Sequence, residues 1–152
     1  MKQTEEIFEA IERLQHLAAL FGKRRGQLAK RAGLTEAQWR VLEGVSDEHF
    51  IPSMFADGLD NTRGAVSKIL KQLIEKKLIT AAISREDGRQ RRYRLTARGD
   101  RTIESLRKLR RHAIRRIWSG LPLDDLVVFN RLCDSLITNL RSYAVQEDEQ
   151  EK

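Results

Sequence analysis

The residues best placed to do chemistry in this 152-residue chain are arginines around a predicted β-hairpin. Residues 78–83 and 90–95 have the composition of strands, and Asp87-Gly88 between them is typical of a chain reversal. Guanidinium groups at this density repel one another unless an anion lies near, and a phosphate backbone is the obvious partner. A hairpin that is merely solvated is the alternative. The cationic side chains near the tip and on the return strand are Arg85, Arg89, Arg91, Arg92 and Arg94.

A helix predicted from Thr62 precedes this hairpin. Val66, Ile69, Leu70 and Leu73 recur at three- and four-residue spacing, so one stripe of the helix faces a core. The Thr62 hydroxyl is a plausible N-cap. Small residues in the exposed first turn permit close approach of the backbone, and arginine can reach guanine edges or phosphates. The candidate contact residues are Thr62, Arg63, Gly64, Ala65, Ser67, Lys68 and Lys71.

A helix presented at its N-terminal end beside a cationic finger is what a protein needs to read duplex DNA. On the return strand, period two places Tyr93 and Leu95 on one face and leaves Arg92 and Arg94 on the other. The remaining alternative for the helix is an amphipathic segment with a solvated basic face. RNA binding is disfavoured because Tyr93 is the only aromatic residue of the hairpin and its periodicity points it inward.

The sequence gives little support to a catalytic, metal-binding or cofactor-binding site. The three histidines are scattered, there is no glycine-rich phosphate loop, and the acidic pair Asp124-Asp125 lies at a helix start, where the dipole favours it. The sequence therefore predicts no enzyme, no metal and no cofactor. Cys133, the single cysteine, lies on an apolar stripe; a buried structural thiol is favoured over a redox role.

Composition bounds the class of protein. A formal net charge of +7 favours polyanionic partners, without separating DNA from RNA or an anionic membrane surface. No apolar run approaches the roughly 20 residues that span a bilayer, and nothing near Met1 resembles a signal peptide. We therefore expect a cytoplasmic protein with no membrane partner.

Long amphipathic helices frame the central segment. We expect one over about residues 4–32, ended by Gly33, a short one started by a Thr35–Gln38 capping box, one over about 97–119 capped by Thr96, and one over about 123–144. The predicted fold is mainly α with a small β-wing. Residues 34–96 form a winged helix-turn-helix domain, residues 1–33 and 97–146 a helical dimerisation region, and residues 147–152 an acidic, disordered tail.

Several segments, in order and spacing, resemble the multiple antibiotic resistance regulator (MarR) family of winged-helix transcription factors. They are residues 34–42, 59–79, 87–89 and 95–99. The family commonly has glycine where Lys77 stands, so the turn before the wing could have a different shape. The segment 47–52 is not a close match either.

The resemblance implies roles for particular residues. Residues 62–72 fall on the recognition helix that enters the major groove, and Ser53 falls near the start of the preceding helix, which touches the DNA backbone. Asp87 and Arg89 match the Asp-x-Arg motif of the wing, in which the arginine reaches into the minor groove and the aspartate orients it. A small aromatic or phenolic effector is implied between the helical region and the winged helix.

These inferences favour a homodimer that binds double-stranded DNA, acts as a repressor at a pseudo-palindromic operator and is released by an effector. The three long stripes exceed what one small core can cover, which favours the dimer over an intramolecular bundle. A protein-interaction module or a non-specific nucleic-acid-binding protein is the alternative.

Overall fold

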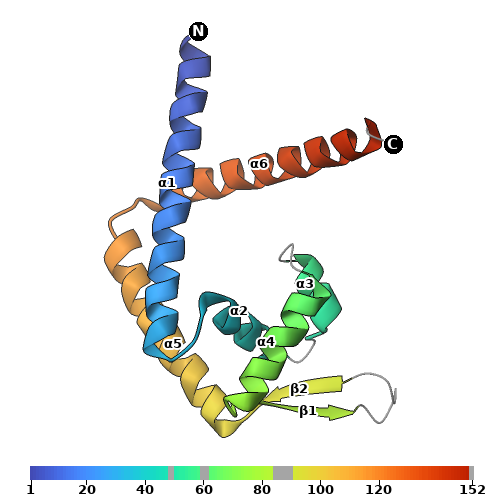
Figure 1. Cartoon of the computed structure of the whole chain (residues 1–152). Helices are drawn as coiled ribbons and strands as arrows, with labels where there is room; N and C mark the ends of the chain where they lie inside the picture. Colours follow the sequence, from blue (N-terminus) through green and yellow to red (C-terminus); the bar gives the residue numbers. More distant parts are fainter. Residues whose placement is uncertain (48–49, 59–61, 84–90, 151–152) are drawn as a thin grey trace. The chain divides into compact units, whose positions relative to one another are not determined.

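The computed structural model describes residues 1–47, 50–58, 62–83 and 91–150. Six helices and two strands follow one another along this part of the chain (Figure 1). Their bounds are α1 Lys2–Arg31, α2 Glu36–Val45, α3 Pro52–Gly58, α4 Arg63–Glu75, β1 Ile79–Ile83, β2 Arg91–Leu95, α5 Ala97–Trp118 and α6 Leu123–Gln150. The fold is therefore mainly helical with one two-stranded sheet, as the sequence predicts.

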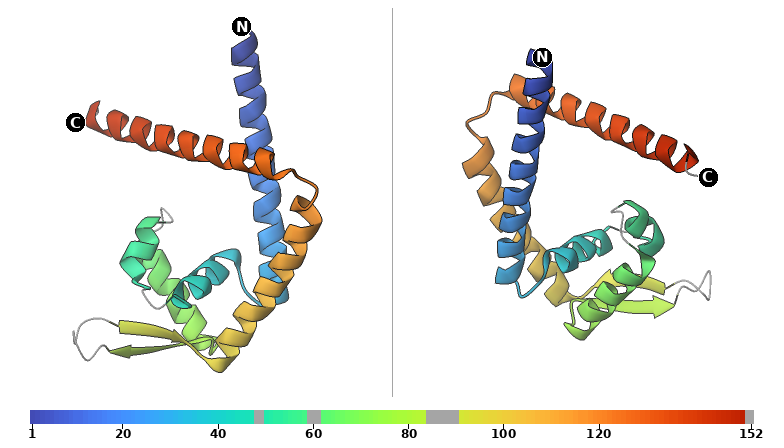
Figure 2. Two further views of the ribbon diagram at one scale, coloured as in Figure 1. Left: turned by 180° about the vertical axis from the view of Figure 1, so that it is seen from behind. Right: turned by 45° about the horizontal axis from the view of Figure 1, so that its top comes forward.

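The chain forms two compact units, Met1–Arg111 and His112–Lys152, which are described separately. In the first, α2, α3 and α4 lie together, and the β1–β2 hairpin extends from the end of α4 in both further views (Figure 2). The core of this unit comprises side chains from α1, α2, α3 and α4, from the start of β1 and from the first turns of α5. The fully buried large side chains are Trp39, Val41, Leu42, Val66, Leu70, Leu73, Ile79, Ile103 and Leu106.

Polar caps start the helices where the sequence predicts them. Thr35 and Gln38 form both hydrogen bonds of a capping box at the start of α2. The Thr62 hydroxyl accepts from the Ala65 amide at 3.1 Å, and the Thr96 hydroxyl accepts from the Gly99 amide at 3.0 Å. These bonds satisfy amides that have no partner within the first turn of a helix.

Lys77 ends α4 in the left-handed conformation, with a φ of 59°. The Leu78 amide donates to the Leu73 carbonyl at 3.0 Å and the Lys77 amide to the Ile74 carbonyl at 2.9 Å. This is the Schellman arrangement in which glycine is usual. The turn before the wing therefore has the shape that glycine favours, although lysine stands there.

The hairpin is antiparallel and pairs Ile79 with Leu95 and Ile83 with Arg91 at its two ends. Tyr93 and Leu95 are half-buried while Arg92 and Arg94 are exposed, which confirms the two faces expected from period two. The Tyr93 ring lies edge-on to Phe50 at 6.2 Å between centroids, so the wing packs against the segment that leads into α3. The predicted reversal at 84–90 lies outside the described residues.

α1 and α5 are joined to α2 by charged side chains. The guanidinium groups of Arg25 and Arg110 lie 5.1 and 5.9 Å from the ring centroid of Trp39. Arg110 also pairs with Glu43 at 3.0 Å. Trp39 thus has a cation from each neighbouring helix within the distance of a cation–π contact.

Most of the apolar stripe of α1 is exposed, in line with the expectation that one small core cannot cover the long stripes; Leu28 and Ala29 are the buried residues of this helix. One expectation about the framing helices needs correction. α6 continues to Gln150, past the expected end at Ala144 and through most of the expected tail, because residues 145–150 contain no glycine or proline to stop it. The described helices include none with the length and apolar character that crossing a membrane requires.

Candidate nucleic-acid interface

The first turn of α4 is presented to solvent by the burial of its opposite face. Val66, Leu70 and Leu73 are buried, so the residues between them are turned outward. Thr62, Arg63, Gly64, Ser67, Lys68 and Lys71 are exposed, and Ala65 is half-buried. A Cβ atom on Gly64 would meet nothing within 4 Å, so no described residue covers the helix at this position.

A groove brings α4 together with two other elements. It is lined by Ser53 near the start of α3, by Arg63 and Ser67 on α4, and by all five residues of β2. The cationic side chains in its lining are Arg63, Arg91, Arg92 and Arg94. We call this the arginine groove, and it unites five of the site residues predicted from the sequence: Ser53, Arg63, Ser67, Arg91 and Arg92.

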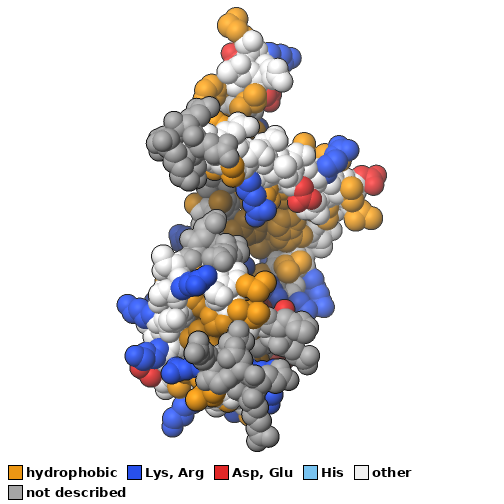
Figure 3. Space-filling model, turned by 90° about the vertical axis from the view of Figure 1, so that its right-hand side faces the viewer, with side chains coloured by type: hydrophobic (Ala, Val, Ile, Leu, Met, Phe, Trp, Pro, Cys, Tyr) orange, Lys and Arg blue, Asp and Glu red, His pale blue; other side chains and the backbone are white. Residues whose placement is uncertain are grey.

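The remaining predicted residues fall into two groups. The first group lies at the N-cap and on α4 and does not line the arginine groove; its members are exposed except for Ala65, which is half-buried, and they are Thr62, Gly64, Ala65, Lys68 and Lys71. Arg85, Asp87 and Arg89, the predicted wing tip, lie outside the described residues. Figure 3 presents the molecule from the right-hand side of Figure 1, where blue Lys and Arg side chains lie at the surface.

Arg94, which alternation places on the same face of the hairpin as Arg92, also lines the arginine groove. The groove contains two acidic residues that sequence reasoning missed. Asp47 and Asp100 line it as well and offset part of its positive charge. The acidic residues could not be found from local patterns, because they come from the end of α2 and the start of α5.

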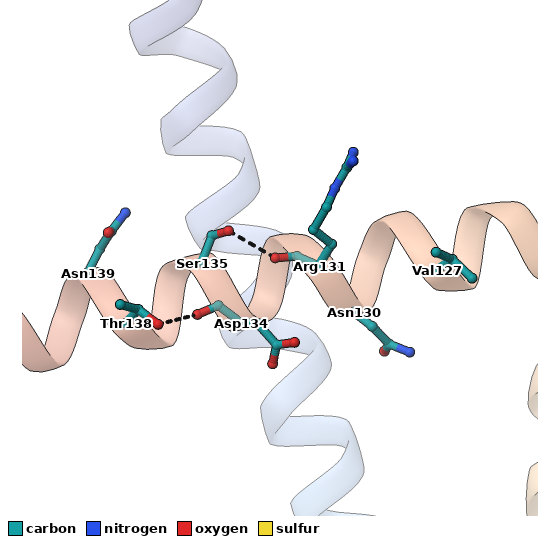
Figure 4. A pocket seen from close by; sticks show the side chains of 7 residues that line it. All are labelled: Val127, Asn130, Arg131, Asp134, Ser135, Thr138 and Asn139. Carbon is teal, nitrogen blue, oxygen red and sulfur yellow. Dashed lines mark hydrogen bonds between the residues drawn. The ribbon is translucent and has the colours of Figure 1, made fainter.

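A second feature of the surface is a shallow depression on α6. Its lining residues all belong to this one helix, and in the close-up Arg131 and Asp134 point to different sides of it (Figure 4). The hydroxyls of Ser135 and Thr138 donate to the carbonyls one turn earlier, at 3.0 and 2.9 Å. The side chains do not converge on a common point, so the depression has no geometry for catalysis.

No group of three His, Cys, Asp or Glu side chains that could hold a metal occurs in the described part of the chain. Cys133 is half-buried on α6. The buried thiol expected from the sequence is therefore only partly covered within one chain.

The packing of α2, α3 and α4 with a two-stranded wing, beside a cationic groove, defines a winged helix-turn-helix protein. Comparison with known proteins agrees: residues 32–90 match the sequence model of the MarR family. The matched segment contains α2, α3, α4 and β1, so the similarity to the MarR family covers most of the winged helix-turn-helix.

Individual relatives extend the match beyond the winged helix. The HTH-type transcriptional repressor IacR of Pseudomonas putida is 27% identical over 118 residues, which cover 76% of this chain and 70% of the relative. Among solved structures, the MarR family transcription regulator SP03579 has a TM-score of 0.84 at 22% identity, over 93% of this chain and 95% of that one.

Two further solved structures contain bound molecules. The S. aureus MepR–DNA complex has a TM-score of 0.73 at 18% identity, over 84% of this chain and 93% of that one. CouR from Rhodococcus jostii RHA1, bound to p-coumaroyl-CoA, has a TM-score of 0.68 at 19% identity, over 81% of this chain and 85% of that one. At these identities the likeness shows a common fold.

Proposed function

We propose that the chain is a homodimeric repressor that binds a pseudo-palindromic operator in double-stranded DNA and is released by a small-molecule effector. In this proposal residues 34–96 read the DNA, and residues 1–33 with 97–146 form the dimer. The observation that carries it is the arginine groove, in which the first turn of α4 and the cationic strand β2 line one concave surface. The DNA in the structure of the similar MepR supports the same partner for this chain.

Within the groove, base reading is assigned to the first turn of α4. Arg63 and Ser67 are exposed there, and arginine can bond to both acceptors of a guanine in the major groove. Lys68 and Lys71 lie further along the exposed face, where contacts to phosphates position the protein without reading sequence. We assign Arg91 and Arg92 to contacts between the wing and the DNA. Arg89 is assigned to the minor groove, with Asp87 orienting its side chain.

The dimer is supported by apolar surface that one chain leaves uncovered. No side chain of α6 is buried in the part of the helix described, and Leu132, Leu136 and Leu140 are each more than half exposed. α1 exposes a similar stripe that includes Phe8 and Leu20. Contiguous apolar surface on a protein in water favours association, and a two-fold dimer would present two recognition helices about one turn of DNA apart.

An effector site is supported by a second groove in the first unit. One side offers the guanidinium groups of Arg25 and Arg40, and the other side offers apolar side chains around α3. A planar aromatic carboxylate fits this combination, because its ring can pack on the apolar side while its charge competes with Glu36 for the two arginines. The groove is lined by Arg25, Arg40, Glu43, Gly44, Asp47, Phe50, Ile51, Met54 and Phe55.

The test of the proposal is selection from a random duplex library at about 0.15 M salt, with nonspecific competitor DNA present, followed by sequencing. We expect one pseudo-palindrome to be enriched, with half-sites about 10 base pairs apart. Salt-sensitive binding without enrichment would instead support a protein-interaction module or a non-specific nucleic-acid-binding protein.

The wing assignment has a test of its own. Arg89→Ala should weaken binding to the selected duplex and lower the salt slope by about one unit, since one phosphate contact or its minor-groove equivalent is lost. Unchanged affinity together with an unchanged slope would show that the assignment is wrong.

A further inference from the structure

Gln38 is the only buried polar or charged residue in the described part of the first unit, with 6% of its surface exposed. A buried carboxamide is costly unless its donors and acceptor are satisfied. Gln38 meets this demand with three partner residues, and only one of them belongs to the capping box that the sequence predicts.

The hydrogen bonds around Gln38 join α2 to the end of α4 and, through Lys76, to the turn after α1. Its Oε1 accepts from the Thr35 amide at 3.1 Å and from the Lys76 ammonium at 2.9 Å. Its Nε2 donates to Gln72 Oε1 at 3.0 Å. The Lys76 ammonium donates a further bond to the Gly33 carbonyl at 2.6 Å, just after α1. We call Gly33, Thr35, Gln38, Gln72 and Lys76 the Gln38 cluster.

The Gln38 cluster holds α4 at the end remote from the proposed base-reading residues, Arg63 and Ser67. Gln72 and Lys76 lie in the last turn and at the C-cap of α4, whereas Arg63 and Ser67 lie in its first two turns. From Arg63 to Glu75 the helix is about 18 Å long, so a tilt of about 5° at one end displaces the other by about 1.5 Å. Hydrogen bonds to base edges tolerate less than that.

We infer that Gln38 is a positioning residue for DNA reading: through Gln72 and Lys76 it sets the orientation in which α4 presents Arg63 and Ser67. The inference rests on the proposed function. Apolar contacts of Leu70 and Leu73 hold α4 against the core but are non-directional, so the hydrogen bonds of the cluster supply the angular restraint.

The test compares Gln38→Leu with two matched variants. Gln38→Leu keeps the side-chain volume and removes every bond of the carboxamide. Gln38→Glu keeps an acceptor for Thr35 and Lys76, and a rotated Gln72 amide can donate to it. Thr35→Ala removes the other half of the capping box and leaves Gln72 and Lys76 bonded to Gln38. Each protein is first shown to be fully folded at the assay temperature.

The readout is the ratio of the Kd for unselected duplex to the Kd for the selected pseudo-palindrome. Gln38→Leu should lower this ratio about tenfold with little change in the Kd for unselected DNA, because phosphate contacts tolerate a tilted helix better than base contacts do. Gln38→Glu and Thr35→Ala should keep the wild-type ratio. A merely structural role of Gln38 predicts that Thr35→Ala and Gln38→Leu behave alike, and that result would overturn the inference.

A second readout needs no DNA. In amide NMR spectra of the free protein, Gln38→Leu should shift the resonances of residues 63–67, while Thr35→Ala should leave them in place. Unmoved resonances would overturn the positioning role even if the wild type selects an operator, whereas a wild type without sequence preference would overturn the proposed function itself. If Gln38→Leu does not fold, Gln72→Leu removes the bond to α4 alone and is tested in the same two ways.

Discussion

Lys77 adopts a backbone conformation that costs an ordinary residue about 1–2 kcal/mol relative to its preferred regions. Its carbonyl accepts a hydrogen bond from the Thr96 hydroxyl at 2.7 Å, and the Thr96 amide donates to the Leu78 carbonyl at 3.0 Å. These bonds tie the turn after α4 to the start of α5. The turn is therefore determined by its surroundings, and the side chain at position 77 is not what shapes it.

Replacing Lys77 with glycine should stabilise the protein. Relief of the left-handed conformation outweighs the extra backbone entropy of glycine in the unfolded chain, and we expect a net gain of about 0.5–1 kcal/mol in urea unfolding. Glu75→Gly is the control, since position 75 is helical and the same change there should cost about 1 kcal/mol. Loss of stability in Lys77→Gly would contradict this account of the turn.

Gly99 is required for a different reason, because a neighbouring backbone occupies the space of a side chain. A Cβ atom at this position would overlap with the Leu78 carbonyl oxygen. Gly99→Ala must therefore push the start of α5 away from β1 and should cost several kcal/mol, about 3 or more, in thermal or urea unfolding.

The control for Gly99→Ala is Gly64→Ala, in an open part of the first turn of α4. Its stability should stay the same or rise, because alanine favours the helix by up to about 1 kcal/mol. If both variants unfolded alike, close packing at Gly99 would not be the cause.

At the scale of elements, the exposed residues of α4 have two proposed roles: Arg63 reads bases and Lys71 binds phosphate. Arg63→Ala should weaken binding to the selected duplex by about 1–3 kcal/mol and relax the preference at one base pair. Lys71→Ala should weaken binding uniformly across sequences and lower the salt slope by about 0.9. Competition titrations with single-base variants of the operator at several salt concentrations distinguish the two; a uniform loss in Arg63→Ala would reject its role in base reading.

α5 carries an exposed ion pair whose pH dependence has a definite sign. The hydrogen bond from Arg111, together with its positive charge, lowers the pKa of the Glu104 carboxyl below its ordinary value. The folded-state pKa lies below the unfolded one, so this contribution is present above the unfolded pKa and is lost as the pH falls through the folded pKa. The stability difference between wild type and Glu104→Gln should therefore be small at neutral pH and vanish in acid; a difference that grows in acid would contradict it.

The sequence predicts helices, caps and the hairpin well because each depends on residues close in the chain. The stripe of Val66, Leu70 and Leu73 and the caps at Thr35, Thr62 and Thr96 are local, and the structure confirms them. The links from Gln38 to Gln72 and Lys76 span more than 30 positions, and no local pattern specifies them. For the same reason sequence reasoning missed Asp47 and Asp100 in the arginine groove.

At the scale of the whole molecule, the proposed dimer depends on α6. Its polar residues Arg131, Ser135 and Thr138 share one side of the helix by periodicity, and Leu132, Leu136 and Leu140 share the other. The apolar side is exposed in the single chain, with Leu140 at 66%. Burial of one leucine stabilises an interface by about 1.5–3 kcal/mol, so a charge in that stripe should oppose association strongly.

The decisive variant is Leu136→Asp, with Thr138→Asp as its matched control on the polar side. In sedimentation equilibrium we expect the wild type and Thr138→Asp at twice the chain mass of 17.6 kDa, and Leu136→Asp at the single mass. Because two linked half-sites bind with the advantage of high effective concentration, the monomeric variant should also lose at least about 100-fold in affinity for the full operator while binding an isolated half-site like the wild type. A dimeric Leu136→Asp would place the interface elsewhere, and a monomeric one with full operator affinity would remove the need for a dimer from the proposed mechanism.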